Sequence, residues 1–239
     1  MPLQIVEPQR LYRQIAEQLR SLIAAGEFTT GSRLPAERDL AKQFGVSRPS
    51  VREALIALEV EGWVEVRTGS GVYVLAHNGA AVNGHATQVP ATEWGPLELL
   101  RARRLIEGEI AAMAATHAKR KNVQAIRESI DAMAQDVERG VKPLEADRAF
   151  HAAIAQACGN AVLLETVQTF WDARHGPLFE RLGGHFESSA VWRLAIAEHE
   201  AVLAAIRLRD ADGARAAMQQ HMDKTNARFS ASWRRANGS

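Results

Sequence analysis

Residues 46–58 read Val-Ser-Arg-Pro-Ser-Val-Arg-Glu-Ala-Leu-Ile-Ala-Leu, and this stretch has the features of a short helix with one specialised end. Ser47 is a helix N-cap residue, and Pro49 lies in the first turn, where a missing backbone N–H costs little. Apolar residues recur at helical spacing along one face, whereas serines and arginines gather at the N-terminal end. That end is where a recognition helix meets base edges and phosphates, so the pattern favours a helix that reads a DNA major groove.

The residues on either side of this stretch complete a recognisable motif. Residues 10–25 predict an amphipathic supporting helix, and residues 34–44 predict a second helix that ends at Gly45. Two short helices joined by a tight turn that contains glycine are typical of a helix-turn-helix. The following residues, 63–74, alternate between apolar and polar side chains in two short runs around a glycine-rich turn, which predicts a β-hairpin, or wing.

Five short motifs occur in a fixed order in this region. They are Leu-Pro-Ala-Glu-Arg at 34–38, Val-Ser-Arg at 46–48, Val-Arg-Glu-Ala-Leu at 51–55, Glu-Gly at 61–62 and Arg-Thr-Gly-Ser-Gly at 67–71. Together they resemble the winged helix-turn-helix of the GntR family of bacterial transcription regulators. The resemblance implies that residues 1–76 form a domain that binds double-stranded DNA.

The same resemblance implies which residues contact the operator. They are Arg38, Ser47, Arg48, Pro49, Ser50 and Arg52, with Arg67, Thr68 and Gly69 at the tip of the wing. An arginine fork can pair with guanine O6 and N7, and serine hydroxyls at a helix N-terminus suit phosphates. A single arginine in isolation is more simply a solvated surface charge, but three of them on a turn and a recognition helix favour DNA contact.

Composition and charge narrow the class of protein. The chain has 239 residues, 46% of them hydrophobic, and a formal net charge of +1. Residues 1–76 contain nine basic and nine acidic residues, so DNA binding must depend on where the charges lie. The single cysteine, Cys158, fits a reducing compartment, and no stretch has the length of a membrane span or the pattern of a signal peptide. We therefore expect a cytoplasmic protein without a membrane partner.

The rest of the chain predicts a mainly α protein. Residues 77–94 have no apolar period and are expected to be a linker. Residues 95–239 predict an all-α antiparallel six-helix bundle. The six expected helices span residues 96–118, 122–139, 141–157, 161–182, 188–208 and 210–232.

Histidines in this second domain indicate a metal site. Asp147 and His151 are four residues apart and so project from one helix face, while His199 and His221 fall on the last two helices. Three imidazoles and a carboxylate can bind zinc or another divalent transition metal. The alternative for each histidine is a hydrogen-bonded core residue.

Further motifs extend the family resemblance to this domain. They are Arg-Arg-Leu-Ile-Glu at 103–107, Asp-Arg-Ala-Phe-His at 147–151, Glu-His at 198–199 and Gln-His at 220–221. These resemble the metal-containing ligand-binding domain of FadR-type GntR regulators. That group implies Asp147, His151, His199 and His221 as metal ligands, and Arg103 as a residue that binds an acid ligand.

A narrower resemblance is to hexuronate-operon repressors, through motifs such as Phe-Trp-Asp-Ala-Arg-His at 170–175. It implies that Trp171 and Arg174 also line the effector cavity, where an indole can pack against sugar carbons and an arginine can pair with a carboxylate. Their simpler interpretations are a core aromatic and a surface cation. The sequence departs from this group around residues 176–184, so the resemblance predicts a sugar acid as the class of ligand and does not specify one compound.

These observations predict a homodimeric repressor that binds a palindromic operator and leaves it when a sugar acid binds at the metal. Zinc is the expected metal, with nickel or manganese accepted by the same ligands. Two alternatives stay open from the residues alone. One is a metal-responsive regulator without an organic ligand. The other is a metal-dependent sugar-acid enzyme with Glu107 or Glu200 as base, although neither glutamate lies in a catalytic motif and an enzyme would leave the winged helix unexplained.

Overall fold

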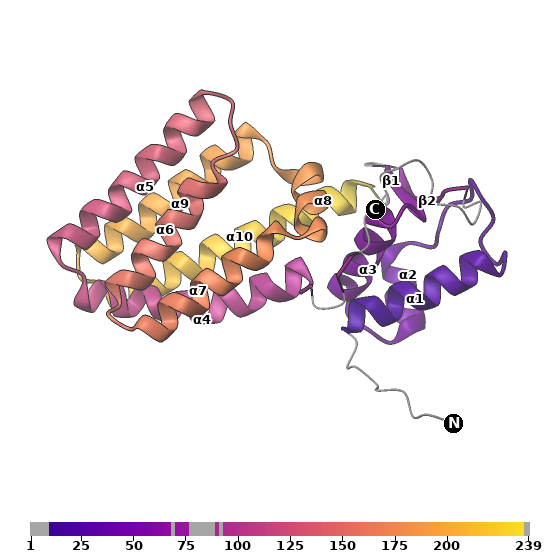
Figure 1. The fold of residues 1–239 in the computed structure, drawn as a ribbon, viewed down its shortest axis with the longest axis horizontal. Helices are drawn as coiled ribbons and strands as arrows, with labels where there is room; N and C mark the ends of the chain where they lie inside the picture. The colour runs from indigo at the N-terminus through magenta and orange to yellow at the C-terminus, as the bar shows by residue number, and fades with distance from the viewer. Residues whose placement is uncertain (1–9, 68–69, 77–88, 91–92, 237–239) are drawn as a thin grey trace. The chain divides into compact units, whose positions relative to one another are not determined.

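The computed structural model describes residues 10–67, 70–76, 89–90 and 93–236. The chain forms two compact units (Figure 1). The first comprises residues 1–98, 176–182 and 231–239, and the second comprises residues 99–175 and 183–230. None of the helices in the described parts of the chain is both long and apolar enough to cross a lipid bilayer.

Three helices form the core of the first unit. They are α1 (Leu11–Ala24), α2 (Glu37–Phe44) and α3 (Arg48–Val60). The expected helices are confirmed, and so are the signals that delimit α3, since Ser47 Oγ accepts a hydrogen bond from Ser50 N and Pro49 lies in the first turn. Gly45, with φ 66°, ends α2 in the left-handed conformation that glycine adopts at least cost.

The wing is a two-stranded antiparallel sheet, as expected. Strand β1 (Val64–Arg67) pairs with β2 (Gly71–Val74), and the register places Val64 opposite Val74 and Arg67 opposite Gly71. A segment before α2 joins the sheet as well, because Leu34 N donates to Val72 O and Arg33 forms a bridge with Tyr73. The sequence pattern did not predict this third segment, since it has no alternating period of its own.

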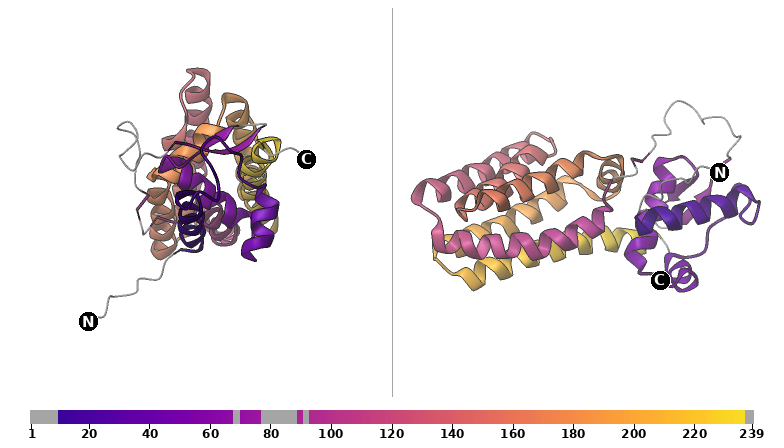
Figure 2. Two further views of the ribbon diagram at one scale, coloured as in Figure 1. Left: turned by 90° about the vertical axis from the view of Figure 1, so that its right-hand side faces the viewer. Right: turned by 60° about the horizontal axis from the view of Figure 1, so that its bottom comes forward.

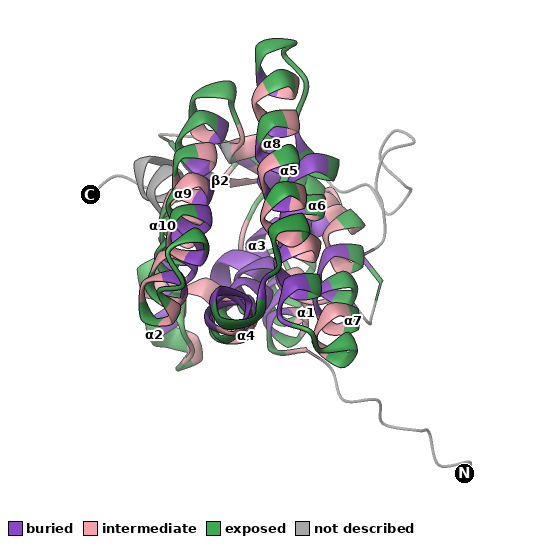
Figure 3. Cartoon of the chain, turned by 90° about the vertical axis from the view of Figure 1, so that its left-hand side faces the viewer, coloured by how far each residue is buried: buried purple, intermediate pink, exposed green. Residues whose placement is uncertain are grey.

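The second unit contains the helical bundle (Figures 1 and 2). Its helices are α4 (Pro96–His117), α5 (Arg120–Glu138), α6 (Leu144–Ala157), α7 (Ala161–Asp172), α9 (Ser189–Arg207) and α10 (Ala211–Ala236). Helix α5 packs against α6 and α9 through Ile126, Ile130 and Met133, which are almost fully buried. In Figure 3 these helices carry buried residues on their inner sides and exposed residues on their outer sides, as an amphipathic period requires.

One expected helix is two helices in the structure. The prediction of a continuous helix over residues 161–182 was wrong, because α7 ends at Asp172, a 3₁₀ turn covers Ala173–His175, and α8 (Pro177–Phe186) begins at a proline. Proline has no N–H for the helical ladder and is favoured at a helix start. A Cβ on Gly176 would lie 2.1 Å from Glu93 Oε1, so a side chain there would displace Glu93. The all-α class is confirmed, with one helix more than expected.

Residues 176–182 belong to the first unit through two contacts. Leu178 N donates to Glu93 Oε1 at 3.0 Å, and Arg181 Nη2 donates to Glu59 Oε1, on α3, at 2.8 Å. The expected boundary of the second domain at residue 95 therefore does not coincide with the compact units, since α4 begins within the first unit and residues 176–182 return to it.

Candidate functional site

The N-terminal end of α3 is the exposed part of the predicted recognition helix. All residues from Ser50 to Glu59 are buried, whereas Ser47 is exposed and the Arg48 side chain retains 46% of its exposure. Pro49 is half-buried. Any DNA contact by α3 within this unit would therefore centre on the first turn.

A buried carboxylate on α2 holds two of the predicted DNA-binding arginines. Arg48 Nε donates to Glu37 Oε1 at 2.7 Å, and Arg52 Nε donates to Glu37 Oε2 at 2.8 Å. Glu37 and Arg52 are 2% and 3% exposed. Glu37 thereby fixes the start of α3 against α2 and orients Arg48, so it is a positioning residue that the sequence interpretation missed. Its place in the sequence could have indicated this role, because Glu37 directly precedes Arg38 in the Pro-Ala-Glu-Arg motif that carries the family resemblance.

The other predicted DNA-binding residues are placed as follows. Arg38 is exposed and contacts the neighbouring Asp39. Arg67, at the end of β1, pairs with Glu65 and lies over the ring of Tyr73. Ser50 is buried beside Ser47, while Thr68 and Gly69 lie outside the described residues.

Three histidines meet inside the second unit. His151 comes from α6, His199 from α9 and His221 from α10, and all are buried, with ligand atoms within 4.8 Å of one another. The Nε2 atoms of His199 and His221 are 3.2 Å apart. Asp147 Oδ1 lies 3.4 Å from His199 Nε2 and 3.5 Å from His151 Nε2. The structure thus brings the four predicted metal ligands together.

The spacing of these atoms fits a metal ion. Zinc–nitrogen bonds of about 2.1 Å in tetrahedral geometry separate neighbouring ligand atoms by about 3.4 Å. The three separations above, three of the six among the four ligand atoms, are close to that value. Asp147 Oδ1 and His151 Nε2 have no hydrogen-bond partner among the described residues although both are buried. Unpartnered buried polar atoms are costly, and a cation between them would satisfy both.

Two glutamates orient the histidines from behind. Glu107 Oε2 lies 2.5 Å from His151 Nδ1, and Glu198 Oε2 lies 2.9 Å from His221 Nδ1. A carboxylate on the second nitrogen of an imidazole fixes its tautomer and raises its basicity as a ligand. Both glutamates were missed as site residues, although each stands in a motif, Glu107 four residues after Arg103 and Glu198 directly before His199.

Charge and burial set the protonation of the cluster. Burial would raise the pKa of Glu107, but the charges of Arg103 and His151 outweigh it and lower that pKa to about 2. Burial lowers the pKa of His199 well below its usual value, and it also lowers the pKa of His221. Burial opposes a charge on His151 too, but the charge of Glu107 prevails and raises the pKa of that histidine. Two of the three histidines are therefore held in the neutral form that binds metals.

The three residues predicted to bind the effector lie beside this cluster. Arg174 Nη1 donates to Asp147 Oδ2 at 3.2 Å, and Arg103 Nε donates to Glu107 Oε1 at 2.5 Å. The guanidinium carbons of Arg103 and Arg174 lie 4.9 and 4.2 Å from the ring centre of Trp171. One buried and one half-buried cation therefore share one indole next to the predicted metal ligands, which is a setting that suits a carboxylate.

Comparison with known proteins gives a family match for each of the two parts of the chain. The gntR family of bacterial regulatory proteins matches residues 11–74, and the FCD domain matches residues 98–224. This chain belongs to the GntR family. It is a DNA-binding transcriptional regulator, and the alternative of an enzyme is set aside because the matching families and relatives are regulators.

Two relatives from Escherichia coli are similar along most of their length. The Exu regulon transcriptional regulator is 38% identical, over 93% of this chain and 86% of the relative. The Uxu operon transcriptional regulator is 35% identical, over 92% of this chain and 87% of the relative. The solved structure of Escherichia coli McbR/YncC, 23% identical with a TM-score of 0.51, covers 93% of this chain and 98% of its own, and it supports the fold alone.

Proposed function

We propose that this regulator represses genes of hexuronate catabolism and leaves its operator when a hexuronate or related sugar acid binds in the second unit. Support for the gene class comes from the Exu and Uxu regulators, to which the chain is similar over more than nine-tenths of its length. The regulator acts in the cytoplasm as a homodimer on a palindromic operator, because a recognition helix reads a short half-site and dimers read two of them.

The observation that carries the proposal is the juxtaposition of the histidine cluster with two arginines, Arg103, which is buried, and Arg174, which is half-buried. Asp147, His151, His199 and His221 are the proposed ligands of a divalent metal, with zinc preferred over nickel or manganese because the separations fit tetrahedral geometry. When bound, such a metal is a Lewis acid that accepts carboxylate and hydroxyl oxygens.

The residues around the cluster would select the effector. Arg174 contacts the proposed ligand Asp147 and is only 15% exposed, so an acid ligand bound there would gain a charge-assisted pair in a site largely shielded from water. Trp171 holds both Arg103 and Arg174 by cation–π contact. We propose that these three residues recognise the carboxylate of the effector.

At the DNA, Arg48 is the proposed base reader, since it is exposed at the start of α3 and oriented by Glu37. Arg38 and Ser47 are exposed and suited to contacts with phosphates, and Arg67 is exposed at the wing, where it could contact DNA. Arg52 supports the first turn of α3 through Glu37. Pro49, Ser50, Thr68 and Gly69 complete the proposed operator-binding set.

Fluorescence anisotropy on the chain's own upstream DNA tests the proposal. Galacturonate, glucuronate or their keto isomers should weaken the complex about 5- to 150-fold, the range of typical allosteric coupling. If none of them changes the affinity, the hexuronate assignment fails while the DNA-binding function stands. If metal alone controls the affinity, the regulator is a metal sensor.

A further inference from the structure

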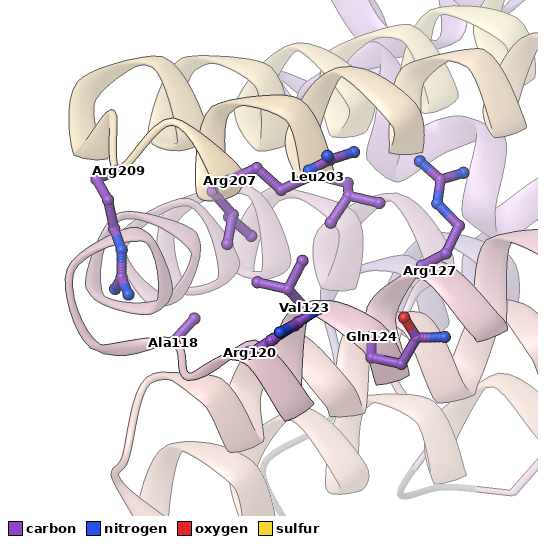
Figure 4. A pocket seen from close by; sticks show the side chains of 9 residues that line it. Ala118, Arg120, Val123, Gln124, Arg127, Leu203, Arg207 and Arg209 are labelled. Carbon is purple, nitrogen blue, oxygen red and sulfur yellow. The ribbon is translucent and has the colours of Figure 1, made fainter.

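A pocket lies in the bundle, between α5 and the C-terminal end of α9, and four of the nine residues that line it are arginines (Figure 4). Its volume is about 460 Å³, which is within the range of small-molecule sites. Its polar wall consists of Gln124 and the four arginines 120, 127, 207 and 209. None of the described residues that line it is acidic.

The charge of the pocket is largely uncompensated. Arg127 is neutralised, because it forms a bidentate pair with Glu200 and also contacts Asp131. Arg120 and Arg207 are exposed and make no hydrogen bond or ion pair with any residue that the structure describes. Like charges held around one pocket repel one another, so an anion bound there would be stabilised.

Arg209 is fixed at the pocket by its backbone and by its side chain. It follows α9 in the left-handed conformation, with φ 60°, where glycine is the usual residue. Its Nη1 donates to the carbonyl oxygens of Ala115 and Thr116, near the end of α4. These carbonyl groups carry no formal charge, so they hold the guanidinium and offset its charge only in part, through the negative end of the α4 dipole. In Figure 4 the Arg209 side chain reaches toward Ala118 at one end of the pocket.

The start of α5 adds positive charge to the same region. Lys119, Arg120 and Lys121 are consecutive, and the first turn of α5, all of it described, contains no acidic residue. The N-terminus of a helix carries partial positive charge, and acidic residues are the stabilising ones there. In the free protein these basic residues are repelled by the positive end of the α5 dipole, which costs stability. A bound anion would be attracted by both.

The floor of the pocket is apolar. Val123 on α5 faces Leu203 on α9 across the pocket, and Ile206 lies one turn further along α9. Leu203 and Ile206 are buried. A ligand with an anionic group at the arginines could therefore place a carbon skeleton on this surface.

We propose that this pocket binds a small phosphorylated metabolite as a second effector, separate from the metal cluster and independent of the function assigned to it. A phosphate monoester carries nearly two negative charges and three acceptor oxygens. Arg120, Arg207 and Arg209 all line the pocket, so a phosphate, with its higher charge and its third oxygen, would gain more from them than a carboxylate would. The apolar floor holds the organic part of the ester.

Isothermal titration calorimetry on the full-length chain tests the proposal with glucose 6-phosphate, inorganic phosphate, succinate and glucose as probes. The two phosphates should bind, glucose should not, and succinate should bind more weakly than the phosphate ester. The double variant Arg120→Gln/Arg207→Gln should weaken phosphate binding at least 10- to 100-fold, the loss expected for one or more charge-assisted hydrogen bonds. Arg193→Gln is the matched control, because Arg193 is also an exposed arginine of α9 but lies outside the pocket.

A second readout separates ligand binding from folding. Both substituted arginines are exposed and unpaired among the described residues, so the double variant should melt no lower than the wild type without phosphate, because repulsion is relieved. The proposal is overturned if the double variant binds phosphate as tightly as the wild type, since that phosphate would then occupy another site. It is also overturned if neither phosphate binds at millimolar concentration, or if succinate binds more tightly than the ester.

Discussion

Replacing Glu107 with glutamine should weaken metal binding without removing any of the four proposed ligands. The Glu107 carboxylate is 2% exposed and serves two donors, with Oε2 at 2.5 Å from His151 Nδ1 and Oε1 at 2.5 Å from Arg103 Nε. A carboxylate accepts from both sides, whereas a glutamine amide must turn its NH₂ group toward one of the two donors. One charge-assisted hydrogen bond is therefore lost, which costs about 1.5–3 kcal/mol.

That cost corresponds to a loss of metal affinity of about 10- to 100-fold, the usual effect of removing a carboxylate behind a ligand histidine. Competition with a chromophoric zinc chelator measures it, and circular dichroism verifies that the variant is folded. Glu109→Gln is the control, because Glu109 lies on the same helix but is exposed and pairs with Arg215. If folded Glu107→Gln binds zinc within twofold of the wild type, the histidine cluster is not the metal site or Glu107 does not orient it.

Three further results are expected. Arg48→Ala should lower specific operator affinity by about 1–3 kcal/mol in an anisotropy assay, because the half-exposed side chain is the proposed base reader, and the domain should stay folded because Arg52 still pairs with Glu37; an unchanged footprint would show that another face binds DNA. Glu37→Gln should lower both operator affinity and the thermal midpoint, since it removes the charged partner of two arginines and weakens at least one charge-assisted hydrogen bond, a loss of about 1.5–3 kcal/mol; full stability would contradict the buried pair. Metal-free protein should lose stability as the pH falls from 6.5 to 5.5, by about 1 kcal/mol for His199, whose pKa is well below its usual value, and by a smaller amount for His221. The pKa values of both histidines are lowered in the folded state, so in that window the unfolded chain takes up protons before the folded chain does. His151 has a raised pKa, so its contribution to stability is lost as the pH rises above 6.5. A midpoint that rises on acidification would refute this assignment.

The features that could be predicted from the sequence are local ones. Ser47, Pro49 and Gly45 act on the backbone within a few residues, so the helix ends of the first unit follow from the sequence alone. The pairing of Asp147 with His151 is local as well, because residues four apart share a helix face. The break at Pro177 was also readable, yet the apolar period on both sides of it favoured one helix.

The features that could not be predicted depend on residues far apart in the chain. Arg52 has the pattern of a groove reader, but its burial depends on Glu37, which another helix supplies. Glu107 reaches His151 only after α4 and α6 have been brought together in the bundle. No spacing rule specifies such contacts, because they are set by tertiary packing rather than by the helical period.

The central claim is that a sugar acid bound at the histidine cluster releases the regulator from DNA. The most direct test measures operator affinity by anisotropy, with and without galacturonate or glucuronate, for the metal-loaded wild type and for His199→Ala. We expect one of the hexuronates to weaken the wild-type complex about 5- to 150-fold and to leave His199→Ala bound. Equal release of both proteins by the same acid would contradict the claim, because the effector would then act without the cluster.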